Sequence, residues 1–147
     1  MTSPVRGSYL STFEHSFDAK GRITVPSDWR GENHELNLHV FPSKDGCLKV
    51  YPESWLARQI AEMATLSLED PRRKQIEALS RIAQAAKPDA KVGRMMVREG
   101  LRRHAGLGKE AVLVGSGDHF EVWDKQQWTA RPAQDLTLED AAAAAGI

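Results

Sequence analysis

The chain has 147 residues, of which 20 are Lys or Arg and 20 are Asp or Glu, so its formal net charge is zero. Hydrophobic residues make up 41% and charged residues 27%, proportions that are typical of a globular protein and exclude an intrinsically disordered chain. No apolar run approaches the length of a membrane-spanning helix, and no signal-peptide core follows the first residues. We therefore predict a cytoplasmic protein without a membrane partner.

The first predicted strand follows from alternation, because Phe and His alternate with polar residues over positions 13–18. A turn comes directly after it. Gly21 can adopt the positive φ that such a turn needs, and Asp18 can accept hydrogen bonds from nearby backbone N–H groups. We therefore predict a hairpin whose return strand covers residues 22–25.

The return strand has two distinct faces. Ile23 and Val25 share one face, which places Arg22 and Thr24 on the other. Arg22 is thus expected on a rigid strand, pointing away from the apolar side. The segment 26–31 then predicts a single helical turn, because Pro ends strand pairing and a final Gly ends the turn.

A second hairpin is predicted over residues 36–51, where alternating apolar residues flank a turn that contains Pro and Gly. Its return strand contains Cys47, the one cysteine of the chain. A single cysteine cannot form an internal disulfide, so we interpret Cys47 as a buried small hydrophobe. A reactive thiol is the alternative.

Two helices are predicted next, over residues 52–63 and 70–82, and they must pack on the sheets or on another subunit because each is marginal alone. The chain then returns to strands. The later elements are a strand over 95–97, a helix over 98–105, and two strands over 111–114 and 119–123 that are joined by a Gly-rich turn. The four tryptophans are interpreted as core or interface anchors. The Ala-rich end, 129–147, is expected to be a flexible tail or a weakly formed helix.

One pattern occurs twice along the chain. Residues 18–25 correspond to residues 90–97 at an offset of 72, and both segments are short basic turns that enter a strand. The same offset places residues 48–51 over residues 120–123 with their apolar positions in register. The spacing predicts two copies of a small domain that pack together, so that a surface offered by one copy is offered twice.

The charges are distributed unevenly. Residues 72–109 contain eleven Lys or Arg against three Asp or Glu, whereas residues 110–147 contain two against seven. A local positive field attracts phosphates within a Debye length even when the net charge is zero. The alternative interpretation of the basic run is a solvated helix face.

Several motifs occur in order and at suitable spacing along residues 6–128. They are Arg6-Gly7, Asp18-Ala19-Lys20-Gly21-Arg22-Ile23-Thr24-Val25-Pro26, Gly46-Cys47-Leu48-Lys49-Val50-Tyr51-Pro52 with Trp55, Ala105-Gly106-Leu107, Val112-Leu113-Val114-Gly115, and Phe120-Glu121-Val122-Trp123-Asp124 with Trp128. Together they resemble the MraZ family of bacterial transcriptional regulators, which carry two SpoVT-AbrB-type domains in one chain.

The resemblance implies an α+β fold: a duplicated swapped-hairpin β-barrel of the AbrB/MraZ type with short helices and a connecting helical pair. On this basis we expect domain 1 at 7–55, a helical connector at 56–82, domain 2 at 83–128 and the tail at 129–147.

The resemblance also implies a function. Members of the family form ring-like homo-oligomers that bind short direct repeats in the promoter of the cell-division and cell-wall gene cluster, often upstream of their own gene. A nucleoid-associated, autoregulatory repressor that binds double-stranded promoter DNA is therefore expected. The candidate DNA-contacting residues are Lys20, Gly21, Arg22, Thr24 and Arg94, followed by Arg6, Lys91 and Arg98.

The second copy departs from the family pattern, because Ala90, Lys91 and Val92 stand where an Asp, a spacer and a polar residue are usual. Asp89 can supply the acidic group only if this turn is one residue longer. Two interpretations stay open for the second turn. It is structural, or it contacts phosphates through basic residues that include Lys91, Arg98, Arg102 and Arg103.

Other function classes find less support. The five histidines show no metal-ligand spacing, and the segment 115–117 lacks the remaining residues of a phosphate loop or nucleophile elbow, so we predict a hairpin turn there and no enzyme. No cofactor, metal or small-molecule ligand is expected. The alternative from another class is an antitoxin-like AbrB relative that binds a protein partner.

Overall fold

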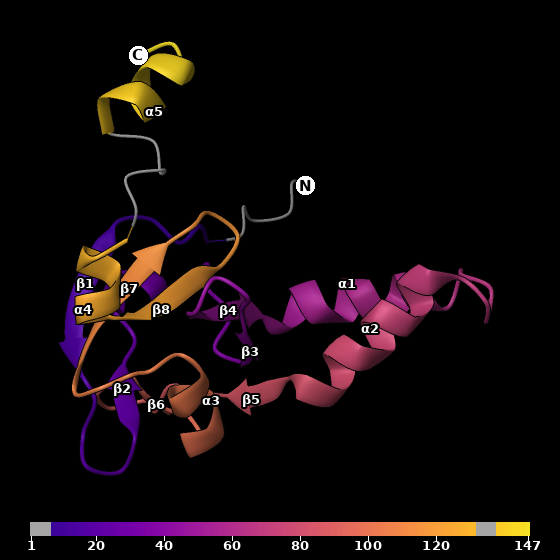
Figure 1. Cartoon of the computed structure of the whole chain (residues 1–147), viewed down its shortest axis with the longest axis horizontal. Helices are drawn as coiled ribbons and strands as arrows, with labels where there is room; N and C mark the ends of the chain where they lie inside the picture. The colour runs from indigo at the N-terminus through magenta and orange to yellow at the C-terminus, as the bar shows by residue number, and fades with distance from the viewer. Residues whose placement is uncertain (1–6, 132–137) are drawn as a thin grey trace.

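The computed structural model describes residues 7–131 and 138–147 (Figure 1). The strands are β1 (Thr12–Ser16), β2 (Arg22–Thr24), β3 (Leu38–Pro42), β4 (Leu48–Pro52), β5 (Gln84–Ala86), β6 (Arg94–Met96), β7 (Glu110–Gly115) and β8 (Phe120–Asp124). The helices are the 3-10 turn η1 (Ser27–Trp29), α1 (Glu53–Met63), α2 (Pro71–Ile82), α3 (Glu99–His104), α4 (Lys125–Thr129) and α5 (Leu138–Ala144). The fold class is α+β, as predicted.

One antiparallel sheet contains strands of both halves, which are interleaved. Its order is β1-β7-β8-β4-β3-β5, and β2 pairs with β6 in a separate two-stranded ribbon. Within the described residues, β1 and β5 are the two edges of the larger sheet, so this sheet does not close into a barrel. The strand β5, at one of these edges, was not predicted; its three residues are too few to show a period.

The prediction of a local hairpin over residues 13–25 is wrong. The turn itself forms, because the Asp18 N–H donates to the Arg22 carbonyl at 2.9 Å and Gly21 has a φ of 77°. However, β1 pairs with β7 and β2 pairs with β6, so each strand finds its partner in the second half of the chain. Alternation specifies that a strand forms and which face it buries, but not which strand it pairs with.

The pairing has an internal two-fold character. In the ribbon, Ile23 lies opposite Met95, and in the sheet Lys49 of β4 lies opposite Glu121 of β8. Both pairs join residues that are 72 positions apart, which is the repeat offset of the sequence. The two copies therefore face each other across these two contacts.

The core is built from both halves. Ile23, Val50, Met95 and Phe120 are all fully buried in one continuous cluster. Trp29, at the end of η1, stacks on Phe120 with ring centroids 4.8 Å apart, which confirms its role as a core anchor. Full burial of such side chains contributes about 1.5–3 kcal/mol each. Among the described residues this cluster draws on both halves, so we expect the halves to fold together.

Cys47 is fully buried, as predicted. Burial, reinforced by the charge of Glu121, raises the pKa of its thiol to about 12. A thiol with such a pKa is not a reactive thiolate near neutral pH, which disfavours the alternative interpretation. The turn over residues 115–119 joins β7 to β8, and the Ser116 N–H donates to the His119 carbonyl at 2.9 Å. It is a hairpin turn, as predicted.

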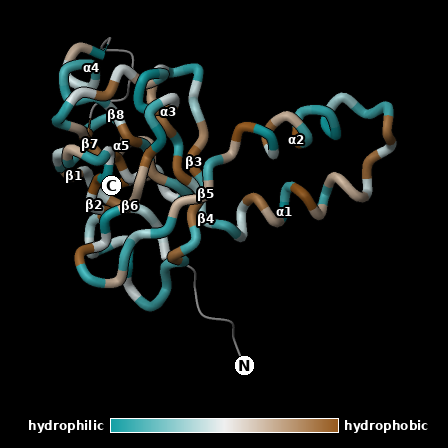
Figure 2. The backbone as a smooth tube through the Cα atoms, turned by 90° about the horizontal axis from the view of Figure 1, so that it is seen from below, coloured by the Kyte–Doolittle hydropathy of each residue, from teal (hydrophilic) through white to brown (hydrophobic). Residues whose placement is uncertain are grey.

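The helices α1 and α2 form an antiparallel pair that projects from the sheet (Figures 1 and 2). Asp70 caps α2 by accepting a hydrogen bond from the Arg72 N–H at 2.9 Å, and Pro71 occupies the first turn. Ile60 on α1, Ile82 on α2 and Leu68 in the loop between these helices are between 43% and 72% exposed. None of the described helices combines the length and apolar character that crossing a bilayer requires.

Candidate nucleic-acid interface

The ribbon of β2 and β6 brings the two Gly-Arg segments together. Arg22 lies opposite Met96 and Thr24 lies opposite Arg94. The central residues of the two strands are fully buried, so the alternate positions lie on the opposite, more exposed face of the ribbon. Three of the candidate DNA-contacting residues, Arg22, Thr24 and Arg94, therefore share one face.

The first turn is organised by the Asp18 carboxylate. Its Oδ1 accepts hydrogen bonds from the N–H groups of Lys20 and Arg22, both at 2.9 Å. Its Oδ2 accepts from Arg22 Nε at 2.7 Å. These bonds, with the Arg22 N–H first among them, lower the pKa of Asp18, so this carboxylate stays ionised and holds the Arg22 side chain in place.

The second turn is organised by Asp89 and is one residue longer than the first. The Asp89 Oδ1 accepts from the N–H groups of Lys91, Val92 and Gly93, and Oδ2 accepts from the Arg94 N–H. These backbone bonds, that of Val92 foremost, lower the pKa of Asp89 to about 2. Asp89 thus takes the acidic role in the longer turn, which was the condition stated from the sequence.

The two arginines differ in how they are held. Arg94 Nη1 lies 3.6 Å from Asp18 Oδ2, and Arg94 Nε lies 3.9 Å from Asp89 Oδ2. Arg94 Nε has no hydrogen-bond partner among the described residues. The Asp18 carboxylate therefore interacts with the guanidinium groups of both copies, tightly with Arg22 and loosely with Arg94.

The remaining candidates surround this face. Lys20, Lys91 and Arg98 are exposed, and within the described residues their side chains have no ion-pair or hydrogen-bond partner. Gly21, which is part of the first turn, is buried. Arg6 lies outside the described residues. Around the ribbon, the free cations give a positive surface that favours a polyanion.

Comparison with known proteins connects this geometry to a family. A family model described as "MraZ protein, putative antitoxin-like" matches residues 9–78 and, a second time, residues 80–145. The chain belongs to the MraZ family. This membership confirms the resemblance inferred from the motifs, and the two matches confirm that the chain is a duplication. MraZ is not an enzyme family, in agreement with the prediction of no catalysis.

Several MraZ relatives align over most of their length, and each is named "Transcriptional regulator MraZ". The protein of Lachnoclostridium phytofermentans is 36% identical over 131 residues, covering 87% of this chain and 89% of the relative. That of Corynebacterium glutamicum is 37% identical over 123 residues, covering 83% and 85%. That of Finegoldia magna is 31% identical over 123 residues, covering 82% and 83%.

Two arginines lie against the turns, and only one of them was considered from the sequence. Arg102 was considered only as one of several phosphate contacts, and Arg30 was missed. Each packs against the glycine of the opposite turn, since a Cβ on Gly21 would lie 2.9 Å from Arg102 Cζ and one on Gly93 would lie closer still to Arg30 Cζ. The signal was available, because Arg30 and Arg102 are 72 positions apart.

The chemistry of the site is that of a polar and cationic surface. In the part of the chain that the structure describes, no group of three or more His, Cys, Asp or Glu side chains could hold a metal ion. A two-stranded ribbon fits the major groove of DNA, and Arg on such a ribbon can bind a guanine edge through two nitrogens or bind a phosphate. The MraZ ribbon has the shape and the side chains for either contact.

Proposed function

We propose that this chain is a sequence-specific DNA-binding transcriptional regulator whose β2·β6 ribbon enters the major groove of promoter DNA. The observation that supports this most directly is the pairing of the two Gly-Arg segments in one ribbon, with Arg22 and Arg94 on the same face. The names of the relatives, all transcriptional regulators, agree with the proposal.

Arg22 is the residue expected to contribute most to base recognition. Its Nε is bound to Asp18 at 2.7 Å, so the guanidinium is oriented before DNA arrives and its terminal nitrogens remain for a guanine edge. Holding a side chain in advance reduces the ordering cost of about 0.5–1.5 kcal/mol that binding otherwise requires. Lys20, Thr24, Arg94, Lys91 and Arg98 are proposed as the surrounding contacts, and Gly21 allows the close approach of the backbone.

A single ribbon offers few contacts, so we propose that the protein acts as a ring-like homo-oligomer that presents several ribbons to short direct repeats. Binding of the first ribbon raises the effective concentration of the next. The exposed apolar residues of the α1–α2 pair and its connecting loop, Ile60, Leu68 and Ile82, are consistent with contact between subunits. The proposed target is the promoter of the cell-division and cell-wall gene cluster, bound by a cytoplasmic, nucleoid-associated, autoregulatory repressor.

The proposal retains the division of the chain into domain 1 at 7–55, a helical connector at 56–82, domain 2 at 83–128 and a tail at 129–147. Each domain supplies one Gly-Arg segment to the ribbon. The connector supplies most of the α1–α2 pair, and no DNA contact is assigned to the tail.

The decisive experiment is a salt-titrated binding assay with the duplex upstream of the protein's own gene and a scrambled duplex of equal length. Wild type is expected to prefer the upstream duplex and to shift it in steps, and Arg22→Ala is expected to abolish the preference while remaining oligomeric. Arg72→Ala is the matched control, because Arg72 also pairs with a nearby Asp, at 2.9 Å, but lies on α2.

The second candidate function is a protein-binding module of the antitoxin type. The wording of the family description and the exposed apolar residues on α1 and α2 favour it. If wild type ignores both duplexes at low salt but forms a stoichiometric complex with a protein partner, the regulator proposal is wrong and this second function takes its place.

A further inference from the structure

Arg30 and Arg102 occupy equivalent positions at the two ends of the ribbon. Arg30 Nε donates to the Val25 carbonyl at 2.8 Å, and Arg102 Nε donates to the Val97 carbonyl at 3.0 Å. Each arginine is thus anchored to the residue that follows the ribbon strand of its own half. Its guanidinium then lies against the glycine of the other half's turn.

The turns accommodate these guanidinium groups because they contain glycine. Gly21 and Gly93 have φ values of 77° and 81°, which side chains rarely tolerate. A Cβ at either position would also collide with the arginine from the other half. The same glycines therefore allow the backbone conformation of each turn and leave space for a guanidinium group against it.

These two cations differ from the arginines on the ribbon face. Arg22 and Arg94 lie beside the carboxylates of Asp18 and Asp89. Arg30 and Arg102 are half-buried, and within the described residues neither side chain has a carboxylate within ion-pair distance or a second hydrogen bond. Half-burial of a cation without a counter-ion costs solvation free energy, which a bound anion recovers.

The spacing of the two positions suits duplex DNA. The Val97 N–H donates to the Gly21 carbonyl and the Val25 N–H donates to the Gly93 carbonyl, so the pairing extends one residue beyond each end of the ribbon. Gly21 and Val25 are four residues apart, a span of about 13 Å at roughly 3.3 Å per residue. The major groove is about 12 Å wide. Cations at the two ends of the ribbon would therefore meet the two phosphate backbones that border the groove.

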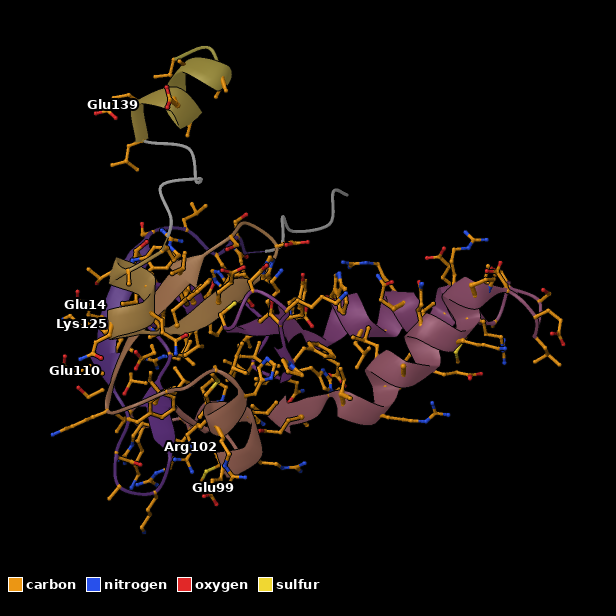
Figure 3. The ribbon with its side chains drawn as sticks, in the orientation of Figure 1. Glu14, Glu99, Arg102, Glu110, Lys125 and Glu139 are labelled. Atoms are coloured by element: carbon orange, nitrogen blue, oxygen red, sulfur yellow. The ribbon has the colours of Figure 1, made fainter. Side chains whose placement is uncertain are left out.

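We propose that Arg30 and Arg102 form a pair of phosphate-binding sites, one at each end of the ribbon, that bind the DNA backbone on both sides of the groove. Arg102, labelled in Figure 3, extends from α3 at the same end of the molecule as the ribbon. The inference rests on the proposed function, and it assigns a separate task to these residues. Arg22 and Arg94 read the sequence, whereas Arg30 and Arg102 contribute affinity that does not depend on sequence.

The test measures how the observed binding constant depends on salt concentration, for the upstream duplex and for the scrambled one. Each neutralised phosphate contributes about 0.9 to the slope of log K against log salt. We expect Arg30→Gln and Arg102→Gln each to reduce that slope by about 1 per ribbon engaged, on both duplexes and with the preference between them retained. Arg30→Lys and Arg102→Lys keep the charge and should keep the slope. Arg72→Gln is the matched control and should behave as wild type.

The outcomes separate the two proposals. If the glutamine variants keep the wild-type slope while wild type still prefers the upstream duplex, the phosphate sites are wrong and the regulator proposal stands. If wild type binds both duplexes equally and the glutamine variants lose slope, the phosphate sites stand and sequence-specific regulation is wrong. A wild type that binds neither duplex overturns both.

A second measurement covers the case in which a glutamine variant fails to fold. The wild-type protein is treated with an arginine-specific dicarbonyl reagent with and without the upstream duplex, and modification is mapped by mass spectrometry. DNA is expected to protect Arg30 and Arg102 severalfold while Arg72 reacts equally in both samples. Equal modification of Arg30 and Arg102 with and without DNA would overturn the proposal.

Discussion

The two turns at the ends of the ribbon have the same sequence pattern, but their aspartate carboxylates bind different groups. In the first turn, Asp18 binds two backbone N–H groups and also the Arg22 side chain. In the longer second turn, the Asp89 carboxylate binds four backbone N–H groups, and the Arg94 guanidinium is held only loosely. One extra residue in the turn is enough to change what the acid holds.

The difference shows which features of the duplicated unit are fixed by the fold. Both copies keep an acid before the turn, a glycine with positive φ and an arginine that enters the strand. Only the first copy uses its acid to orient that arginine. Arg22 is therefore pre-organised and Arg94 is less constrained within its site, so a duplicated backbone need not give two equal binding elements.

The largest expected effect concerns what the copies share, the buried centre of the ribbon. Ile23→Ala and Met95→Ala should each lower the free energy of unfolding by about 2–5 kcal/mol, because both side chains are fully buried and leave a cavity. Urea denaturation with two spectroscopic probes would measure this. Met96→Ala, at a position 45% exposed on the same strand, is the control and should change stability by less than about 0.5 kcal/mol. Two separate transitions, one for each half, would contradict a common core.

The next effect contrasts the two arginines on the ribbon face. Arg22→Ala should weaken binding to the upstream duplex by about ten- to a hundredfold, the range for loss of one bidentate base contact. Arg94→Ala should weaken it several times less, because ordering the loosely held side chain on binding costs free energy. Fluorescence anisotropy at fixed salt provides the comparison. An Arg94→Ala defect as large as that of Arg22→Ala would show that pre-organisation by Asp18 is unimportant.

Alanine at the turn glycines probes the backbone. Gly21→Ala and Gly93→Ala should each destabilise the protein by about 1 kcal/mol or more, because of the positive φ and the arginine that the new Cβ would displace. Gly100→Ala is a control with the opposite expected sign. A Cβ at Gly100 would meet no atom of the described residues within 4 Å, and this position is in α3, where alanine is the better helix former. Thermal unfolding midpoints of the three variants test this expectation: Gly21→Ala and Gly93→Ala should lower the midpoint, and Gly100→Ala should raise it. Equal shifts in one direction would contradict it.

The carboxylates of the two turns predict that the stability of the fold decreases at low pH. The folded-state pKa of Asp89 is about 2, below the ordinary value near 3.9, so its contribution to stability is present above pH ~4 and is lost as the pH falls toward ~2. Asp89→Asn should remove this part of the pH dependence, and Asp18→Asn should remove a contribution of the same sign, because the pKa of Asp18 is also lowered. The measurement is the difference in unfolding free energy between wild type and each variant from pH 5 to pH 2. Parallel wild-type and variant curves would exclude this role of the carboxylates.

The smallest effect concerns a position where the copies differ in chemistry, since the equivalent of Cys47 in the second copy is His119. Burial alone would lower the pKa of His119, but its contacts with Glu121 and Asp118 outweigh burial and raise it. Stability from this charge is therefore full below pH ~6.5 and is lost as the pH rises through the higher folded-state value. Burial lowers the pKa of His15, which makes it an internal reference. Titration by NMR should find His119 above His15, and the reverse order would contradict the contacts.

Much of the local structure was predictable from residues with strong conformational preferences. The turn at Gly21, the cap at Asp70, the helical turn that ends with Trp29 and the strand faces of Ile23 and Arg22 all follow from short-range patterns. Arg94 could be selected as a candidate because it stands 72 positions after Arg22, at the repeat offset.

The partners of these elements were not predictable in the same way. Nothing local tells β2 to pair with β6 instead of β1, and nothing local places Arg30 against Gly93 or Arg94 near Asp18. These contacts join residues from different halves of the chain, and their energy depends on which surfaces the whole fold buries together.

The sequence alone determined the duplication, the acid–glycine–arginine turns and the family, because repeats, backbone preferences and motif order are properties of neighbouring residues. The tertiary structure decided that the two halves exchange strands and that their arginines share one ribbon face. It also decided that an arginine of each half packs against the turn glycine of the other half. The physical reason is that a strand carries its own alternation but not its partner, which is selected only when the apolar faces of both copies are buried in one core.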